Sequence, residues 1–435
     1  MPLAARCAFG LREIVCAAQA LLVCACGAQA QTSSAPLLQK ADLVYEGAFR
    51  VPGGGEDRET LNYGGTSLGY NPINNSLFLI GHDQYNRTAE ISIPDVVNSA
   101  NLSDLRTATL LQPFRDATEG RLKNINPNDP NSQKIGGHLV FGDRLIITGF
   151  STYDGAGTQS ASHFARPLSL STSNQVVGPV AVGSRVHYTS AYMTLIPPEW
   201  QSPFGGPALT GNCCRSIINY QSHGPALSVF NPDDIGQVDP VPATDLLFYT
   251  SRNQLGPGQS TQNPYFNLTT RVEGVVFPNG TRSVLFFGSH GIGPYCYGTG
   301  AKCKDVAKQD KGTHAYPYVY QVWAYDANEL LQAKSGRKAP HKLRPYAIWN
   351  FNLPFERDGA HSLGGAAYDP ASKRVYLSQP RGDKKLPIIH VYRLEQNKRD
   401  AARPPIRSAR GTCSTITEWQ ISDRLAADAT RQQAQ

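Results

Sequence analysis

The sequence predicts an all-β protein built from short antiparallel strands. Its 435 residues include 40 glycines and 31 prolines, and only 17% of the residues are charged, which is typical of a chain with many turns. Short apolar stretches alternate with turn sequences such as Asn279-Gly280, which supply the positive φ angles that tight hairpins need. A third observation, a long repeat, extends this prediction to the architecture.

The repeat is a hairpin that occurs five times along the chain. Each copy opens on Gly-Gly or a near equivalent and continues as an apolar strand, a turn and a second apolar strand. The openings are Gly64-Gly65, Gly136-Gly137, Gly205-Gly206, Glu273-Gly274 and Gly364-Gly365. The copies start about seventy residues apart, except that the last interval is about twenty residues longer. We therefore expect a large loop in the fourth repeat.

A further strand follows the hairpin in several repeats, at residues 89–93, 318–325 and 388–393. Units of three or four antiparallel strands with glycine at the narrow inner start resemble the blades of a β-propeller. The resemblance covers residues 42–394 and rests on the repeat pattern, because no motif of a particular propeller family is present. It implies five blades, with six or seven as alternatives, and a pair of β-sandwiches is the competing architecture.

The last repeat is one strand short. Residues 43–51 precede the first repeat, and their sequence Leu-Val-Tyr-Glu-Gly-Ala-Phe-Arg-Val is that of a strand. We expect this N-terminal strand to complete the last blade and to close the ring.

The first thirty residues have the pattern of a secretory signal peptide. Arg6 and Arg12 are followed by an apolar run, and Ala28-Gln29-Ala30 has the small residues of a cleavage site. A lipoprotein signal that modifies Cys24 or Cys26 is the alternative. We therefore divide the chain into a signal peptide (1–30), a short linker (31–41), the repeat domain (42–394) and a basic, polar C-terminal tail (395–435).

These segments predict a secreted or periplasmic protein. After the signal peptide no apolar stretch is long enough to cross a membrane as a helix. The formal net charge of +7 is small, and the basic residues near the C-terminus are not interleaved with aromatic residues. The sequence therefore predicts no nucleic-acid binding, and we expect a monomer.

Export permits disulfides. Cys296 and Cys303 are seven residues apart and are placed to close one loop. Cys213 and Cys214 either form a vicinal disulfide, which would make a rigid apolar platform at a ligand site, or give one thiol to Cys413.

Histidines and acidic residues recur near the ends of the expected inner strands, where propellers place their functional sites. The candidate catalytic residues are His290, His361, Glu273, Asp358, His82 and Asp83. The candidate substrate-binding residues are Arg271, Arg357, His138, His223, Tyr295 and Tyr297. Each of these histidines and acids also has a structural interpretation, as a hydrogen-bonding residue beside a strand end.

Secreted propellers are known for two reactions on polysaccharides, and the resemblance to this fold implies that these residues would carry out one of them. Glycoside hydrolysis needs two carboxylates, here Glu273 with Asp83 or Asp358. β-Elimination of a uronate needs a base such as His290 or His361, and arginines to neutralise the sugar carboxylate. The number of histidines favours elimination slightly.

The alternative to an enzyme is a secreted scaffold that binds a glycan or a protein through its tyrosine-rich loops. The sequence does not decide between these classes. Convergent histidines would also suit a divalent metal, although no local metal-binding spacing is present, and the sequence identifies no cofactor.

Overall fold

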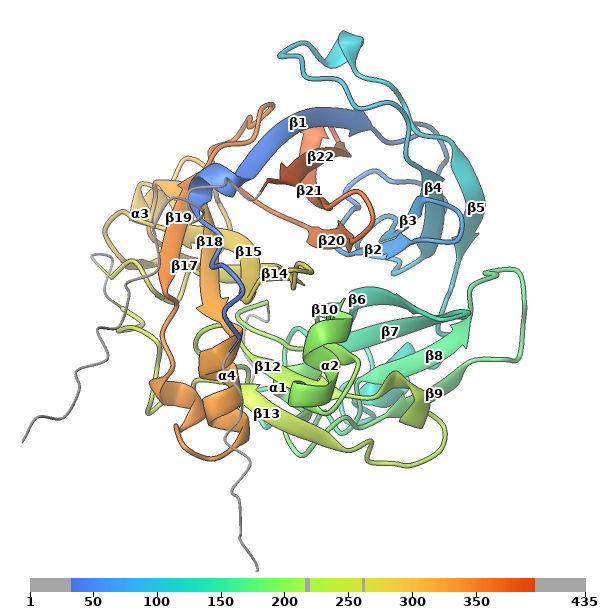
Figure 1. Ribbon diagram of the computed structural model, residues 1–435. Coiled ribbons are helices and arrows are strands. Elements are labelled where there is room, and N and C mark those ends of the chain that lie inside the picture. The colour runs from blue at the N-terminus through green and yellow to red at the C-terminus, as the bar shows by residue number, and fades with distance from the viewer. Residues whose placement is uncertain (1–32, 216–219, 260–262, 396–435) are drawn as a thin grey trace, which may run out of the picture. The chain divides into compact units, whose positions relative to one another are not determined.

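Five four-stranded antiparallel sheets surround a common centre in the computed structural model (Figure 1). The structure describes residues 33–215, 220–259 and 263–395. The predicted signal peptide, Cys413 and nearly all of the predicted tail lie outside the described residues. The innermost strands are β2, β6, β10, β14 and β20, and each contacts the next around the ring, including β20 with β2. The chain therefore forms a five-bladed β-propeller, which confirms the predicted fold class and blade number.

The blades follow one another in chain order, and each is written here from its innermost to its outermost strand. Blade 1 consists of β2 (Leu68–Asn71), β3 (Ser76–Ile80), β4 (Thr88–Ser92) and β5 (Leu110–Arg115). Blade 2 consists of β6 (Gln133–Phe141), β7 (Arg144–Ser151), β8 (His163–Pro167) and β9 (Val177–Val180). Blade 3 consists of β10 (Met193–Leu195), β11 (Ala208–Thr210), β12 (Leu227–Phe230) and β13 (Ala243–Leu247). Blade 4 consists of β14 (Arg271–Val276), β15 (Ser283–Gly291), β18 (Tyr318–Asp326) and β19 (Ala347–Phe351). Blade 5 consists of β20 (Gly365–Asp369), β21 (Arg374–Asp383), β22 (Leu386–Leu394) and β1 (Leu43–Arg50).

The N-terminal strand closes the ring as predicted. β1 pairs antiparallel with β22, from Leu43 opposite Leu394 to Arg50 opposite Ile388. Phe49 of β1 is fully buried and packs in the core between blades 5 and 1. The first and last strands of the propeller thus share one sheet. Because β1 pairs with the outer edge of β22, the last strand of the chain is not an edge strand.

The predicted strands of the third repeat are wrong in order. The segment that follows Gly205-Gly206 is β11, the second strand of its blade, and the innermost strand is β10. The cause is helix α2 (Pro198–Phe204), which lies between these two strands and buries Trp200 and Phe204. Gly205 ends this helix with a φ of 75°, so here the glycine serves as a helix cap and does not open a strand.

We call the face on which the innermost strands begin the upper face. Because the sheets are antiparallel, the second strand of each blade ends on this face and the loop after it lies there too. The longest upper-face loop, between β15 and β18, holds β16 (Cys296–Gly298), α3 (Gly300–Cys303) and β17 (Gly312–His314). The Cys296–Cys303 disulfide pins it, which confirms both the predicted pairing and the predicted large loop.

The remaining helices are short and lie between strands or blades. They are α1 (Val186–Thr189), α4 (Ala327–Lys334), η1 (Lys40–Asp42), η2 (Leu102–Asp104), η3 (Leu122–Ile125), η4 (Pro232–Asp234) and η5 (Pro340–Lys342). No helix in the described part of the chain has the length and hydrophobicity needed to span a membrane.

Part of the predicted linker is docked on blade 4. The backbone N–H of Leu38 donates to Ser283 Oγ at 2.8 Å, and the backbone N–H of Ser33 donates to Asn328 Oδ1 at 3.0 Å. Leu38 itself is buried. Residues 33–38 therefore belong to the packed structure of this blade.

Candidate functional site

Arg215 occupies the centre of the propeller. It lies in the loop between β11 and β12 of blade 3, and its side chain is 5% exposed. The guanidinium donates to the carbonyl oxygens of Thr66, at 2.8 Å, and of Gly136, and its Nε lies 2.6 Å from Glu273 Oε2. These three partners begin or precede the innermost strands of blades 1, 2 and 4. One arginine therefore ties four blades together at the axis.

The close approach at Gly136 depends on the missing side chain. A Cβ atom built on Gly136 would lie 2.5 Å from the carbonyl oxygen of Ser190 in the next blade. Glycine at this position lets the blades converge near the axis. The Gly-Gly openings of the repeat, except Gly205-Gly206, thus mark where the blades approach one another.

Glu273 lies at the centre of a charged cluster on the upper face. Burial raises the pKa of Glu273, although the positive charges of Arg215 and Arg271 act in the opposite direction. The negative charge of Asp83, which follows β3 of blade 1, also raises the pKa of Glu273. Asp83 Oδ2 forms an ion pair with Lys134 Nζ at 2.9 Å. The side chains of Asp83 and Lys134 are 46% and 25% exposed, so the cluster is open to solvent on this side.

Lys308 joins this cluster from the disulfide-pinned loop. Its Nζ lies 3.8 Å from the centre of the Tyr318 ring, and within the described residues no hydrogen bond or ion pair satisfies it. Burial, together with the charge of Arg271, lowers the pKa of Lys308 to about 8, and Asp358 and Glu273 oppose this shift. An amine in this environment can lose its proton near neutral pH.

The loop that carries Lys308 is organised around Asp305, whose side chain is fully buried. The carboxylate accepts hydrogen bonds from the hydroxyl of Tyr318, at 2.7 Å, and from the backbone N–H of Lys308, at 3.0 Å. It also pairs with His314 Nδ1 at 2.8 Å. The position of Lys308 is therefore fixed by contacts within its loop and by Tyr318, the first residue of β18.

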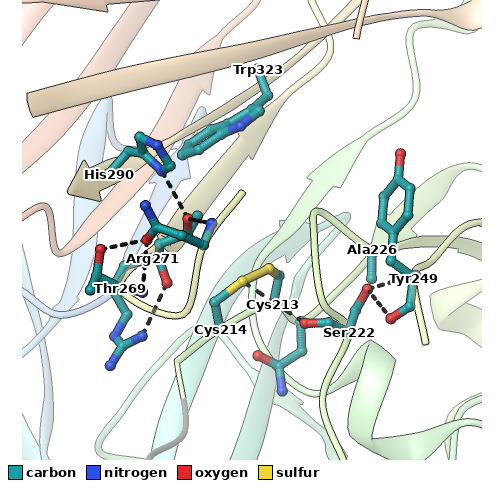
Figure 2. Close-up of a disulfide and its surroundings, with 12 residues drawn as sticks. Cys213, Cys214, Ser222, Ala226, Tyr249, Thr269, Arg271, His290 and Trp323 are labelled. Carbon is teal, nitrogen blue, oxygen red and sulfur yellow. Dashed lines mark hydrogen bonds between the residues drawn. A yellow bond between two sulfur atoms is a disulfide. The ribbon is translucent and has the colours of Figure 1, made fainter. Parts of the chain in front are cut away.

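Cys213 and Cys214 form a vicinal disulfide immediately before Arg215 (Figure 2). The two residues are 0% and 4% exposed and belong to the core between blades 3 and 4. Cys213 forms a β-bridge with Ser222, and Figure 2 shows both cysteines between this strand and the side of Arg271. The pair is thus buried and is no exposed platform for a ligand. Because Cys214 immediately precedes Arg215, the buried disulfide fixes the backbone next to this arginine.

Two of the candidate histidines lie within the packing of the blades. His138 is 2% exposed, and its ring nitrogens lie 2.8 Å from Ser67 Oγ and 3.0 Å from Thr88 Oγ1 of blade 1. His290 is 1% exposed and is bonded to Thr270 Oγ1 at 2.9 Å and to the carbonyl oxygen of Asn263 at 3.1 Å. Burial lowers the pKa of His138 to about 3 and that of His290 to about 4. In Figure 2, His290 lies edge-on to Trp323.

The other candidate histidines are less enclosed. His82 lies between the rings of Tyr63 and Tyr85 on the upper face, and the ring centres are 5.4 and 5.0 Å away. The ring centre of His361 lies 4.8 Å from that of Tyr320, and the two rings are tilted by 58°. His223 contacts the Phe266 ring, its buried Nδ1 has no hydrogen-bond partner, and burial lowers its pKa.

Asp358 and Arg357 are exposed in the loop before β20. Asp358 Oδ1 accepts the backbone N–H of Ala360 at 2.9 Å, so this carboxylate caps the turn around Gly359. Of the predicted site residues, Arg271 and Asp83 act electrostatically on Glu273, and Asp358 acts on Lys308. Arg215 and Lys308 also interact electrostatically with Glu273, and neither was predicted from the sequence.

The upper face also carries exposed tyrosines. Six tyrosines of the described residues expose between 36% and 60% of their surface, and all six lie in upper-face loops. They are Tyr63, Tyr85, Tyr153, Tyr220, Tyr265 and Tyr297. The predicted substrate-binding Tyr297 is thus exposed, whereas Tyr295 beside it is half-buried. Such a face offers aromatic rings to a large ligand.

The described residues contain no group of three or more histidine, cysteine or acidic side chains placed to hold a metal ion. The candidate histidines do not converge, because His138 and His290 are each held within blade packing. The divalent metal considered from the sequence therefore has no ligand set in this part of the chain.

The chain matches no protein-family model and no curated protein sequence. Among solved structures it is similar to a GH43 endo-arabinanase from Bacillus licheniformis, with 11% identity, a TM-score of 0.40 and coverage of 79% of this chain and 95% of that one. An α-L-arabinanase mutant from Cellvibrio cellulosa has 10% identity, a TM-score of 0.38 and coverage of 79% and 94%. A luciferin-regenerating enzyme has 7% identity, a TM-score of 0.32 and coverage of 77% and 91%. Similarities this weak carry no argument about activity.

Proposed function

We propose that this protein is an exported enzyme that cleaves uronate-containing polysaccharides by β-elimination, at the charged cluster on the upper end of the axis. The observation that carries the proposal is the amine of Lys308. It lies without an ion pair beside the oppositely charged Glu273 and Arg271, in a loop fixed by a disulfide. A half-buried amine whose pKa is lowered to about 8 is a suitable general base.

The reaction needs a base, a cation for the sugar carboxylate and a leaving oxygen. Lys308, as the neutral amine, takes the proton from C5 of the uronate. The electron pair forms the C4–C5 double bond, the bond from C4 to the glycosidic oxygen breaks, and water protonates the leaving oxygen. Arg271 stabilises the negative charge that develops on the sugar carboxylate. Arg215 holds the Glu273 carboxylate, so that a second carboxylate can approach.

Glycoside hydrolysis is the second candidate, and one observation favours it. Burial raises the pKa of Glu273, as a general acid requires. The partner carboxylates weaken this alternative, because Asp83 is paired with Lys134 and Asp358 caps a turn. The retaining and inverting mechanisms both need a second carboxylate that is free to act on the sugar or on water.

Export is part of the proposal. The N-terminal pattern of the sequence and the two disulfides support an oxidising compartment. The exposed Tyr297, in the same loop as Lys308, supports a glycan ligand, because sugar rings stack on aromatic side chains.

The test is an incubation of the chain from residue 31 onward with polygalacturonate, alginate, arabinan and glucomannan. Reducing ends and the ultraviolet absorbance of unsaturated uronates are measured together. Elimination predicts both signals from a uronate polymer, and their loss in Lys308→Met but not in Lys311→Met, an exposed lysine of the same loop. Reducing ends without absorbance would establish hydrolysis instead. Neither signal on any polymer would leave a glycan- or protein-binding scaffold as the function.

A further inference from the structure

A cavity of about 330 Å³ lies on the upper face, where loops of blades 2 and 3 meet. Its walls come from the loop after β7, from the segment that leads into α1 and from the loop after β11. The lining residues include Gly157, Ser184, Arg185, His187, Tyr188 and Tyr220. None of these residues was among the candidates identified from the sequence.

One wall of the cavity is an exposed aromatic ring. Tyr220 is 60% exposed, and its ring centre lies 6.1 Å from that of His187. The ring lies against the backbone at Gly157, where an added Cβ would come within 2.6 Å of Tyr220 Cδ2. Gly157 also has a φ of 68°, which favours glycine. The loop after β7 is thus shaped to receive this ring.

The charged groups of the cavity are already neutralised by neighbours. Arg185 Nε lies 3.1 Å from Asp245 Oδ2, and its guanidinium is 4.5 Å from the centre of the Phe248 ring. His187 Nε2 lies 3.2 Å from Asp154 Oδ2, and that carboxylate is almost fully buried. The cavity therefore presents polar donors and acceptors without an unpaired charge. Such a surface recognises hydroxyl groups better than it recognises an isolated anion.

The cavity is connected to the axial cluster by one loop. Asn212 Nδ2 donates to the carbonyl oxygen of His187 at 2.9 Å, and Asn212 immediately precedes Cys213, Cys214 and Arg215. The same loop between β11 and β12 therefore supplies Arg215 to the axis and Tyr220 to the cavity. Both sites open on the upper face, where the exposed tyrosines lie.

We propose that this cavity is a secondary binding site for a pyranose ring of a polysaccharide chain. The apolar face of the sugar stacks on Tyr220, and its hydroxyl groups bond to Ser184, Arg185 and His187. Its substrate class rests on the proposed function, since the same chain would extend from this cavity to the axial cluster. A site of this kind holds a polymer and leaves a short oligosaccharide unaffected.

The experiment measures binding and cleavage separately. Dissociation constants for polygalacturonate, alginate, arabinan and glucomannan are measured by affinity electrophoresis for the wild type, Tyr220→Ala, Tyr220→Phe and Tyr153→Ala. Tyr153 is the matched control, because it is 58% exposed on the same face and does not line the cavity. Cleavage of the polymer and of a trisaccharide of the same sugar is followed in parallel.

We expect Tyr220→Ala to weaken polymer binding roughly three- to tenfold, while Tyr220→Phe and Tyr153→Ala stay within twofold of the wild type. Cleavage of the trisaccharide should not change. If Tyr220→Ala binds the polymer as tightly as the wild type, the secondary site is overturned, and any cleavage that depends on Lys308 still supports the proposed function. If Tyr220→Ala weakens binding but no variant or wild type cleaves a polymer, the site stands and the proposed reaction falls. Failure of the wild type to bind any of the four polymers overturns both.

Discussion

Arg215 Nε and Glu273 Oε2 lie 2.6 Å apart across the axis of the propeller, with both side chains largely buried. Each of these two ions has lost its hydration water, so removing one of them leaves the other charge buried without compensation. The same guanidinium bonds to the backbone of blades 1 and 2. The stability of the ring should therefore depend on this arginine more than on any surface ion pair.

The first prediction concerns that pair. Arg215→Ala should lower the free energy of unfolding by about 3–5 kcal/mol, because it leaves Glu273 buried and unpaired. Adding Glu273→Gln should recover part of this loss. Denaturant unfolding measures both, with Arg144→Ala as the control, since its partner Asp233 is 67% exposed and the expected cost is below about 1 kcal/mol. Equal costs for Arg215→Ala and Arg144→Ala would contradict the axial role.

The second prediction concerns the pH dependence of cleavage. The pKa of Lys308 is lowered to about 8, and the base must be the neutral amine. The rate should therefore rise with pH through about 8 and then level off. Lys308→Arg keeps the charge but does not deprotonate in this range, and should lose at least about a hundredfold in rate. A rate that falls between pH 7 and pH 9 would exclude Lys308 as the base.

The third prediction concerns acid sensitivity. Burial lowers the pKa values of His138, His163 and His390 to about 3. In the unfolded chain the pKa of histidine is about 6.5, so below this pH the unfolded chain binds protons that the folded chain does not. The stabilisation is therefore complete above about pH 6.5 and is lost as the pH falls toward 3. By pH 5 each of these three histidines should lower the free energy of unfolding by roughly 2 kcal/mol relative to neutral pH.

Unfolding free energies of the wild type and His163→Gln at pH 7 and pH 5 test this effect. The variant should lose less stability between the two values, whereas His341→Gln, in the short helix η5, should behave as the wild type. Parallel pH dependence in all three proteins would show that the interior histidines are not the acid-sensitive groups.

The fourth prediction concerns the disulfide of the long loop. Cys296→Ser with Cys303→Ser should reduce polymer cleavage by at least about tenfold, because Lys308 is no longer held against Tyr318. The melting temperature should change little, since the loop lies outside the blade cores. Lys311→Met, in the same loop, keeps the disulfide and serves as the control. Unchanged cleavage in the double variant would mean that Asp305 alone positions the lysine.

The strands were predictable from the sequence where local chemistry decides them. Hairpins such as the one around Asn279-Gly280 combine turn residues with flanking apolar strands, and both signals are local. The prediction of the strand order in the third blade was wrong because Gly205 caps a helix. In the sequence, a glycine pair that precedes a strand cannot be distinguished from one that follows a helix. The closing strand was predicted because the last repeat lacked one.

The candidate site was predictable only in part, because its key contacts are long-range. Glu273 was identified since it replaces glycine in a repeated position. Arg215 reaches Thr66 and Gly136, which are 149 and 79 residues away in the chain, and no local pattern reports this. Lys308 lies in a polar run that resembles a solvated loop, and the extra length of the fourth repeat was the available signal for it.

The pairing of β1 with β22 has a consequence for how the protein is made. Leu43 meets Leu394, so the first strand to be synthesised can pair only after the last one has been made. Until then this segment, with the apolar Phe49, is an unpaired strand beside four growing blades. Contacts so distant in sequence slow folding and leave time for association with other chains. The ring becomes a finished molecule only when its final strand has been made.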